Sequence, residues 1–245
     1  MEGQRREHLV VRREEAAGMI LLDRAERANA YTQAMVDAMS SALDELAADE
    51  SVRAVIVGSA VAGRFCAGAD LDELRSRTPA DGRKLKSAAL FDRIEELSKP
   101  TVAAIGGPAV GGGLELALAC DLRIAAPEAR FSLPETGLGI LPACGGTWRL
   151  QRLVGPAVAR EIILFGRELN GDEALACGLV NELVAPDRLL TRAVELANRV
   201  AGRDAQATSL AKEALRKASG GDTGRDFVTW AQTRLYGRPR KGERR

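Results

Sequence analysis

The sequence predicts an α/β fold, because short runs of β-branched and other apolar residues alternate with longer segments of helical periodicity. Two further observations refine this prediction. Hydrophobic residues make up 46% of the 245 residues, which is enough to bury one large core. Glycines gather after two of the apolar runs, in residues 58–68 and 106–113. Because ligands of α/β proteins commonly bind where strands end, we expect the functional site at these connections.

The first half of the chain supplies most of the predicted strands. Residues 8–13 and 18–22 are expected to pair as two strands joined across residues 14–17. Three further apolar runs have the length and composition of buried strands: residues 52–57, 101–105 and 122–125.

Helices are predicted between and after these strands. Thr32 is a good N-cap for a helix whose apolar residues recur at three- and four-residue spacing, at Met35, Met39, Leu43 and Leu46. A second amphipathic helix is expected over residues 82–97. Residues 127–152 show little regular pattern, and from Pro156 onward the chain is mostly helical. No segment rich in Pro, Gly or Ser separates independent domains.

Composition excludes several kinds of catalytic site. The only histidine is His8, so no relay of the Ser-His-Asp or Cys-His kind and no His-rich metal site is expected elsewhere. Proton chemistry would therefore depend on carboxylates, whose pKa is raised by burial. The cysteines are scattered without a CxxC pair, which indicates buried free thiols: Cys66, Cys120, Cys144 and Cys177.

Charge and hydropathy argue against nucleic acid or a membrane as the partner. The net charge is +1, although Arg238, Arg240, Lys241, Arg244 and Arg245 form a basic tail. Apolar stretches fall short of the roughly 20 residues that cross a bilayer. Residues 1–13 are charged and lack the apolar core of a signal peptide. We therefore expect a compact cytoplasmic protein.

Two glycine-rich turns are the candidate site. Residues 111–113 are three consecutive glycines that follow an apolar run and lead into an apolar helix. Free N–H groups at such a helix start attract negative charge, and glycine lets a ligand oxygen approach the backbone. The glycines could equally form a flexible turn. Residues 65–71, Phe-Cys-Ala-Gly-Ala-Asp-Leu, form a second turn of small residues that could supply another N–H donor. The pattern is neither GK[ST] nor GxGxxG, so a nucleotide site is poorly supported.

Two glutamates accompany these turns. Glu115 lies just inside the helix that follows the glycines, and Glu135 lies in the segment Phe-Ser-Leu-Pro-Glu-Thr. Each alone has a structural alternative, which is to cap a helix or to pair with Arg123, Arg130 or Arg149. Their joint position near the two turns favours a catalytic role.

Three long motifs carry a family resemblance. They are FCAGADL, then KPTVAAIGGPAVGGGLELALACDLRIA, then FSLPETGLGILPACGGTWRL, in this order. Together they resemble the enoyl-CoA hydratase/isomerase, or crotonase, superfamily, and the resemblance extends from about Val10 to about Lys217. Several long motifs in one order are far more specific than a single short pattern.

The resemblance implies both a fold and a site. The fold would be a crotonase-like spiral of ββα units over residues 1–190, with a C-terminal helical trimerisation region over residues 191–245. A homotrimer or a dimer of trimers is implied, with an acyl-CoA thioester as substrate and no cofactor or metal. The backbone N–H groups of Ala69 and Gly112 would form the oxyanion hole. The other implied substrate- and CoA-binding residues are Arg27, Ala28, Ala30, Ala67, Asp70 and Leu71.

The resemblance implies syn addition of water to an enoyl-CoA in fatty acid metabolism. Glu115 would act as base toward the water that attacks C3, and Glu135 would deliver a proton to C2, although these two roles could be reversed. Two alternatives stay open. One is an enoyl-CoA isomerase or another acyl-CoA enzyme of the superfamily, and the other is an acyl-CoA-binding protein without catalysis.

The chain departs from the family pattern in two places. Where relatives often have PGxGGTQRL, this chain has Ala143 in place of the first glycine and Trp148 in place of the glutamine, with Cys144 at the variable position. We expect Cys144 to be an unreactive packed residue, since no base is expected nearby, and Trp148 to pack instead of narrowing the acyl pocket. After residues 227–236 the chain ends in the basic tail in place of a further family helix.

Overall fold

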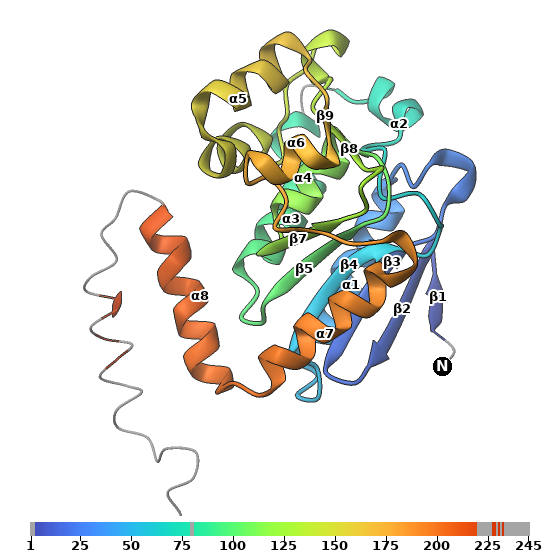
Figure 1. Ribbon diagram of the computed structural model, residues 1–245. Helices are drawn as coiled ribbons and strands as arrows, with labels where there is room; N and C mark the ends of the chain where they lie inside the picture. Colours follow the sequence, from blue (N-terminus) through green and yellow to red (C-terminus); the bar gives the residue numbers. More distant parts are fainter. Residues whose placement is uncertain (1–2, 79–80, 220–226, 229, 231, 233–245) are drawn as a thin grey trace, which may run out of the picture.

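Residues 3–78 and 81–219, together with 227, 228, 230 and 232, are described by the computed structural model (Figure 1). Within these residues the largest sheet has seven strands in the order β1-β2-β3-β4-β5-β7-β10. The first three strands are antiparallel and the remaining pairs are parallel. Their bounds are β1 (Gln4–Arg6), β2 (Leu9–Glu14), β3 (Ala17–Leu22), β4 (Ala54–Ser59), β5 (Thr101–Ile105), β7 (Leu122–Ala125) and β10 (Glu182–Leu183).

Both faces of the sheet are covered by helices, so its central strands are apolar on each side. On one face, residues such as Val55 and Val57 pack with α1 (Gln33–Ala48) and α3 (Lys86–Glu96). On the other face, Ala54 and Ile56 pack with α7 (Leu189–Ala201), which crosses the sheet in Figure 1. This alternation follows the two-residue period of a strand.

A smaller sheet and four further helices lie beyond the ends of the parallel strands (Figure 1). This sheet has the order β6-β8-β9 among the described residues. Its strands are β6 (Ala109–Val110), β8 (Arg130–Ser132) and β9 (Leu169–Asn170). The helices are α2 (Leu71–Arg75), α4 (Gly112–Leu118), α5 (Gln151–Phe165) and α6 (Gly171–Ala176). Helix α4 is buried along its whole length, which places its first turn inside the molecule.

The predicted α/β elements are confirmed with small changes in their bounds. The strands at 101–105 and 122–125 have the predicted bounds, whereas the strand expected at 52–57 runs from Ala54 to Ser59. The helix expected from residue 82 begins at Lys86, because Asp81–Arg83 form a separate 3-10 turn. Thr32 caps α1 as predicted, and its hydroxyl accepts a hydrogen bond from the Met35 N–H at 3.2 Å.

From Pro156 to Ser219 the chain is mostly helical, as predicted. Helix α8 (Ala205–Ser219) is held to the body by an ion pair between Lys212 and Asp121, with 2.7 Å between Nζ and Oδ2. In Figure 1, α8 lies to one side of the sheet and is connected to α7 by a short turn. The basic tail predicted over residues 238–245 lies outside the described residues, as does most of the 227–236 segment.

Candidate active site

The two predicted glycine-rich turns meet beyond the ends of β4 and β5. Cys66 forms a parallel bridge with Ala109, which brings the residues after β4 against β6. Gly68 has a φ of 93°, and a Cβ on it would lie 2.8 Å from the Val110 carbonyl oxygen and 3.2 Å from the Gly112 nitrogen. Only glycine combines this conformation with so close an approach. The turns therefore form one wall of a common site.

Two residues of these turns, Ala69 and Gly112, line a cavity and have backbone N–H groups without a hydrogen-bond partner in the described chain. Tyr31 donates its N–H to the Gly68 oxygen at 2.8 Å and accepts from the Asp70 N–H at 2.9 Å, which makes a parallel bridge to Ala69. Neighbouring residues of a strand point their N–H groups to opposite sides, so the Ala69 N–H points away from Tyr31. Gly112 is the first residue of α4, where the N–H has no intrahelical acceptor. No acceptor for either N–H occurs among the described residues.

The glycine triplet fits its surroundings so tightly that side chains are excluded. A Cβ at Gly112 would overlap the Tyr31 hydroxyl, and one at Gly113 would overlap the Cys66 carbonyl oxygen. Gly111 has a φ of 54°, and its Cβ would lie 2.9 Å from Glu135 Oε1. Each glycine therefore meets a specific neighbour, which a flexible turn would not require.

Glu115 is almost completely buried and its carboxylate is oriented by a loop. The carboxylate atom Oε1 accepts hydrogen bonds from the Cys144 N–H at 2.7 Å and the Gly146 N–H at 2.8 Å. Its side chain is 2% exposed. Burial raises the pKa of this carboxyl, whereas the two backbone donors and the positive charge of Arg149 act in the opposite direction.

Glu135 begins a 3-10 turn, Glu135–Leu138, and lines the same cavity as Glu115. Its Oε2 is buried and has no hydrogen-bond partner within the described part of the chain. Burial raises the pKa of Glu135 from 4.5 to about 7, and the negative charge of Glu115 adds to the increase. A carboxyl with this pKa carries a proton for much of the time at neutral pH, so it can donate one.

The cavity that these residues share has a volume of about 470 Å³. The two glutamates, Ala69 and Gly112 lie on its wall together with apolar side chains, among them Leu71, Leu74, Leu85 and Leu141. A larger hollow of about 950 Å³ lies between α8 and the C-terminal end of α4. Because it contains none of the predicted site residues, size alone does not identify the site.

The arginine pairings offered as a structural alternative for the glutamates are not formed in the described chain. Arg123 donates to backbone oxygens, including that of Cys120 at 2.6 Å, and Arg130 lies 3.9 Å from Glu168. Arg149 forms ion pairs with Asp92 and Glu95, each at 2.6 Å. The two buried carboxylates are thus left facing the cavity.

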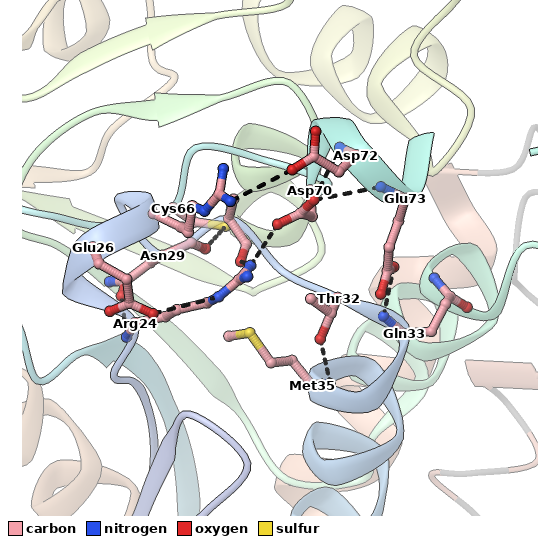
Figure 2. Close-up of polar contacts among 12 residues, drawn as sticks. Arg24, Glu26, Asn29, Thr32, Gln33, Met35, Cys66, Asp70, Asp72 and Glu73 are labelled. Carbon is pink, nitrogen blue, oxygen red and sulfur yellow. Dashed lines mark hydrogen bonds and ion pairs between the residues drawn. The ribbon is translucent and has the colours of Figure 1, made fainter. Parts of the chain in front are cut away.

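A polar network fixes the turn that contains Ala69 (Figure 2). Asp70 accepts from Arg24 at 2.7 Å through Oδ2, and its Oδ1 caps α2 by accepting from the Asp72 and Glu73 N–H groups. Arg24 also donates to the Ala30 oxygen at 2.9 Å. The Asp70 side chain therefore has structural partners, and it does not line the cavity.

Asn29 is a fully buried polar residue that the sequence analysis missed. Its Oδ1 accepts from the Arg24 N–H at 2.8 Å, and its Nδ2 donates to Ser59 Oγ at 2.8 Å and to the Phe65 oxygen at 2.9 Å. Ala28 and Asn29 both have positive φ angles, 49° and 58°. The polar residue within Arg-Ala-Asn-Ala was the signal that could have identified it, since Asn tolerates this conformation and can satisfy several backbone groups.

The other predicted CoA-binding residues divide into two groups. Ala67 and Leu71 line the cavity, and Leu71 is 52% exposed. Arg27, Ala28 and Ala30 lie on a neighbouring segment outside the cavity wall. The Ala28 oxygen accepts from the Ala67 N–H at 3.1 Å, which joins this segment to the Ala69 turn. Arg27 lies 3.5 Å from Asp72 and has an exposed side chain.

Cys144 and Trp148 differ in their relation to the cavity. Cys144 lines it, its Sγ lies 3.2 Å from Ser87 Oγ, and burial raises its pKa to about 12. The expected absence of a nearby base is wrong, because Glu115 is in contact with Cys144. The expected low reactivity agrees with the raised pKa. Trp148 lies outside the cavity wall, and its ring packs on Arg149 with 5.4 Å between guanidinium and ring centre.

In the residues that the structure describes, no group of three or more His, Cys, Asp or Glu side chains is arranged to hold a metal ion. Likewise, none of the helices in these residues has both the length and the hydropathy that crossing a membrane requires.

Comparison with known proteins agrees with this geometry. A family model described as enoyl-CoA hydratase/isomerase matches residues 12–242. The chain belongs to this family. A crystal structure of enoyl-CoA hydratase from Bacillus anthracis superposes with a TM-score of 0.90 at 35% identity, covering 95% of this chain and 92% of that one. The predicted crotonase-like α/β fold is therefore confirmed.

Two curated relatives within this family show similar agreement in sequence. The short-chain-enoyl-CoA hydratase of Clostridium acetobutylicum is 38% identical over 212 residues, which are 86% of this chain and 81% of that protein. The probable mitochondrial enoyl-CoA hydratase 2 of Arabidopsis thaliana is 44% identical over 196 residues. That alignment covers 79% of this chain and 65% of the plant protein.

Proposed function

We propose that this family member is an enoyl-CoA hydratase, which adds water reversibly across the 2,3 double bond of an enoyl-CoA thioester. The observation that carries the proposal is a pair of buried carboxylates, Glu115 and Glu135, on the wall of one cavity. Hydration needs a base for water and an acid for C2, so both carboxylates have a task. An isomerase needs mainly one carboxylate to move a proton.

The different environments of the two carboxylates support different roles. Glu115 accepts two backbone N–H groups, which favour its charged form, so it is the base that activates water for attack at C3. Glu135 has an unpartnered buried oxygen and a pKa of about 7, so it is the acid that protonates C2. Because the charges interact, the measured pKa values will belong to the pair.

The thioester oxygen would accept hydrogen bonds from Ala69 and Gly112. Negative charge develops on this oxygen as water adds to C3, and fixed backbone donors stabilise that charge without rearrangement. Removal of one donor from such a site typically lowers the rate about 10²–10³-fold. No cofactor or metal enters this mechanism, since the thioester itself supplies the activated carbonyl.

Coenzyme A and the acyl chain would occupy opposite sides of these donors. Ala67 and Leu71 would contact the substrate near the thioester, and Asp70 would hold their turn in place through Arg24. Arg27, Ala28 and Ala30 belong to the neighbouring segment that would hold the adenine end. The apolar wall that includes Leu74, Leu85 and Leu141 suits the hydrocarbon part of an acyl chain.

The test is hydration of crotonyl-CoA, followed by loss of the ultraviolet absorbance of the conjugated thioester. We expect turnover by the native protein and a loss of at least about 10²-fold in kcat for Glu115→Gln and for Glu135→Gln. Exposed Glu50 provides the matched control Glu50→Gln, which should retain activity. Retained activity in Glu115→Gln would favour an isomerase, and acyl-CoA binding without turnover would favour a binding protein.

The proposal also covers the oligomeric state of the enzyme and its place in the cell. We expect a homotrimer or a dimer of trimers acting in fatty acid metabolism in the cytoplasm, with residues 1–190 as the catalytic core and residues 191–245 as the assembling part. Exposed apolar side chains at the end of α5, Leu164 at 63% and Phe165 at 84%, are consistent with a subunit contact in which the catalytic core also takes part. Light scattering would measure the assembly, and cell fractionation would test the location.

A further inference from the structure

We propose that Arg149 is a positioning residue for Glu115, acting through the loop of residues 142–146. Arg149 does not line the cavity, and it makes no hydrogen bond to Glu115. It holds the backbone whose N–H groups orient the Glu115 carboxylate. This inference rests on the proposed role of Glu115 as base, and its test includes a measurement that does not require turnover.

Arg149 is a buried guanidinium whose hydrogen bonds point in two directions. Its side chain is 3% exposed. Toward α3, Nε and Nη2 donate to Glu95 Oε2 at 2.9 and 2.6 Å, and Nη2 donates to Asp92 Oδ1 at 2.6 Å. Toward the loop, Nη1 donates to the Cys144 oxygen at 2.8 Å. The planar guanidinium therefore ties the loop to a long helix with fixed geometry.

The same peptide segment presents its other side to Glu115. The Cys144 oxygen binds Arg149, while the Cys144 and Gly146 N–H groups bind Glu115 Oε1. Because these groups belong to one short stretch of backbone, movement of the Cys144 carbonyl moves the donors as well. Glu115, the loop, Arg149 and the α3 carboxylates thus form one continuous chain of contacts.

The local backbone is shaped around this arginine. Gly145 has a φ of 113°, and a Cβ on it would overlap Arg149 Nη1. Residues Gly146–Leu150 form a π-helical turn, and the Arg149 N–H donates to the Gly145 oxygen at 2.8 Å. Wider turns of this kind often occur at functional sites, where they redirect a side chain. Here the turn directs Arg149 back under its own loop.

The role differs from simple stabilisation by an ion pair. Asp92 and Glu95 have side-chain exposures of 55% and 30%, so their charges remain solvated in the absence of the arginine. Loss of Arg149 would instead free the loop and remove a positive charge near Glu115. Both changes disfavour the charged form of the base and raise its pKa. The other titratable groups that face Glu115 are Tyr31, Glu135 and Cys144.

The experiment compares Arg149→Met and Arg149→Lys with the native enzyme in crotonyl-CoA hydration from pH 5 to 9. For Arg149→Met we expect kcat to fall about 10- to 100-fold, part of the 10²–10⁴-fold effect of general acid–base catalysis. We expect little change in KM, and the acid limb of kcat/KM should move to higher pH. Arg149→Lys retains the charge without the planar fork, so its acid limb should move less.

A carboxyl ¹³C NMR titration of Glu115 provides the measurement without turnover. The Glu115 signal would be assigned by its absence in Glu115→Gln, and its pKa should be higher in Arg149→Met than in the native protein. If the native protein shows no hydration, the proposed function fails, while this titration still tests the positioning role. An unchanged Glu115 pKa would overturn the inference whatever the activity.

Two further variants separate positioning from loss of folding. Arg192 also binds two carboxylates, Glu182 and Glu195, but lies away from the site, so Arg192→Met should leave kcat and the acid limb unchanged. Glu95→Gln retains Arg149 while weakening its attachment to α3, and we expect a smaller shift in the same direction. An equal loss of activity in Arg192→Met and Arg149→Met would contradict the proposal.

Discussion

Replacement of Glu135 by Gln should stabilise the protein at alkaline pH. The carboxyl is buried, one of its oxygens lacks a partner among the described residues, and Glu115 lies near enough to raise its pKa. Above pH 7 the folded protein must therefore hold an unfavourable negative charge. The glutamine amide has nearly the same shape and carries no charge.

The size of the effect follows from the pKa difference between the folded and unfolded states. The folded pKa is about 7 and the ordinary value is 4.5. Because the folded pKa is raised, the stability that the protonated Glu135 carboxyl contributes is fully present below pH 4.5. It is lost as the pH rises through 7. The full difference corresponds to about 3 kcal/mol. Solvent in the cavity screens part of it, so we expect about 1–2 kcal/mol.

Thermal unfolding of native protein and Glu135→Gln at pH 5 and pH 8 measures this contribution. The advantage of the variant in Tm should be larger at pH 8 than at pH 5 by roughly 2–8 °C for a chain of this length. Taking the difference between the two pH values removes any fixed cost of the new amide. A variant with the same relative Tm at both pH values would refute the assignment of a raised pKa to Glu135, and Glu50→Gln is the control for a solvated carboxylate.

Three further outcomes test other parts of the site. Gly112→Ala should lower kcat for crotonyl-CoA hydration at least about 10²-fold, because the new methyl group overlaps the Tyr31 hydroxyl beside a proposed donor. Gly137→Ala is the control: its methyl group meets no neighbour within 4 Å, so this variant should remain active. Asn29→Ala removes the three hydrogen bonds of a buried side chain and should lower the free energy of unfolding in urea by about 3 kcal/mol. In the folded protein, a thiol reagent followed by mass spectrometry should label partly exposed Cys177 before the three buried cysteines.

The elements that could be predicted from sequence are those with a strong local pattern. The strand Thr101–Ile105 is apolar throughout because helices cover both sides of the sheet, and α1 has a capping threonine before a regular apolar spacing. The smaller sheet was missed. Its strands contain two or three residues and pair across long stretches of chain, so none of them forms a run with the length of an ordinary strand.

The site divides in the same way. Gly112 and Glu115 share one short segment, so their motif was visible in the sequence. The partners of Glu115, which are Cys144 and Gly146, come from a distant segment, and so does Asn29, which binds the Phe65 carbonyl beside the Ala69 turn. Such contacts depend on tertiary packing, and periodicity contains no information about them. Residue type alone also could not show that Arg149 pairs with α3 and leaves the glutamates unpaired.

The short helix α4 fixes a distance in the proposed reaction. Gly112 and Glu115 are separated by three residues of one helix, which is about 4.5 Å along the helix axis at 1.5 Å per residue. One end of this interval would meet the thioester oxygen and the other the water that attacks C3. The rise of the helix would thus determine which double bond can react, since a double bond further along the acyl chain would lie beyond the base. Selectivity for the site of hydration would be independent of the residues that accommodate the rest of the acyl chain.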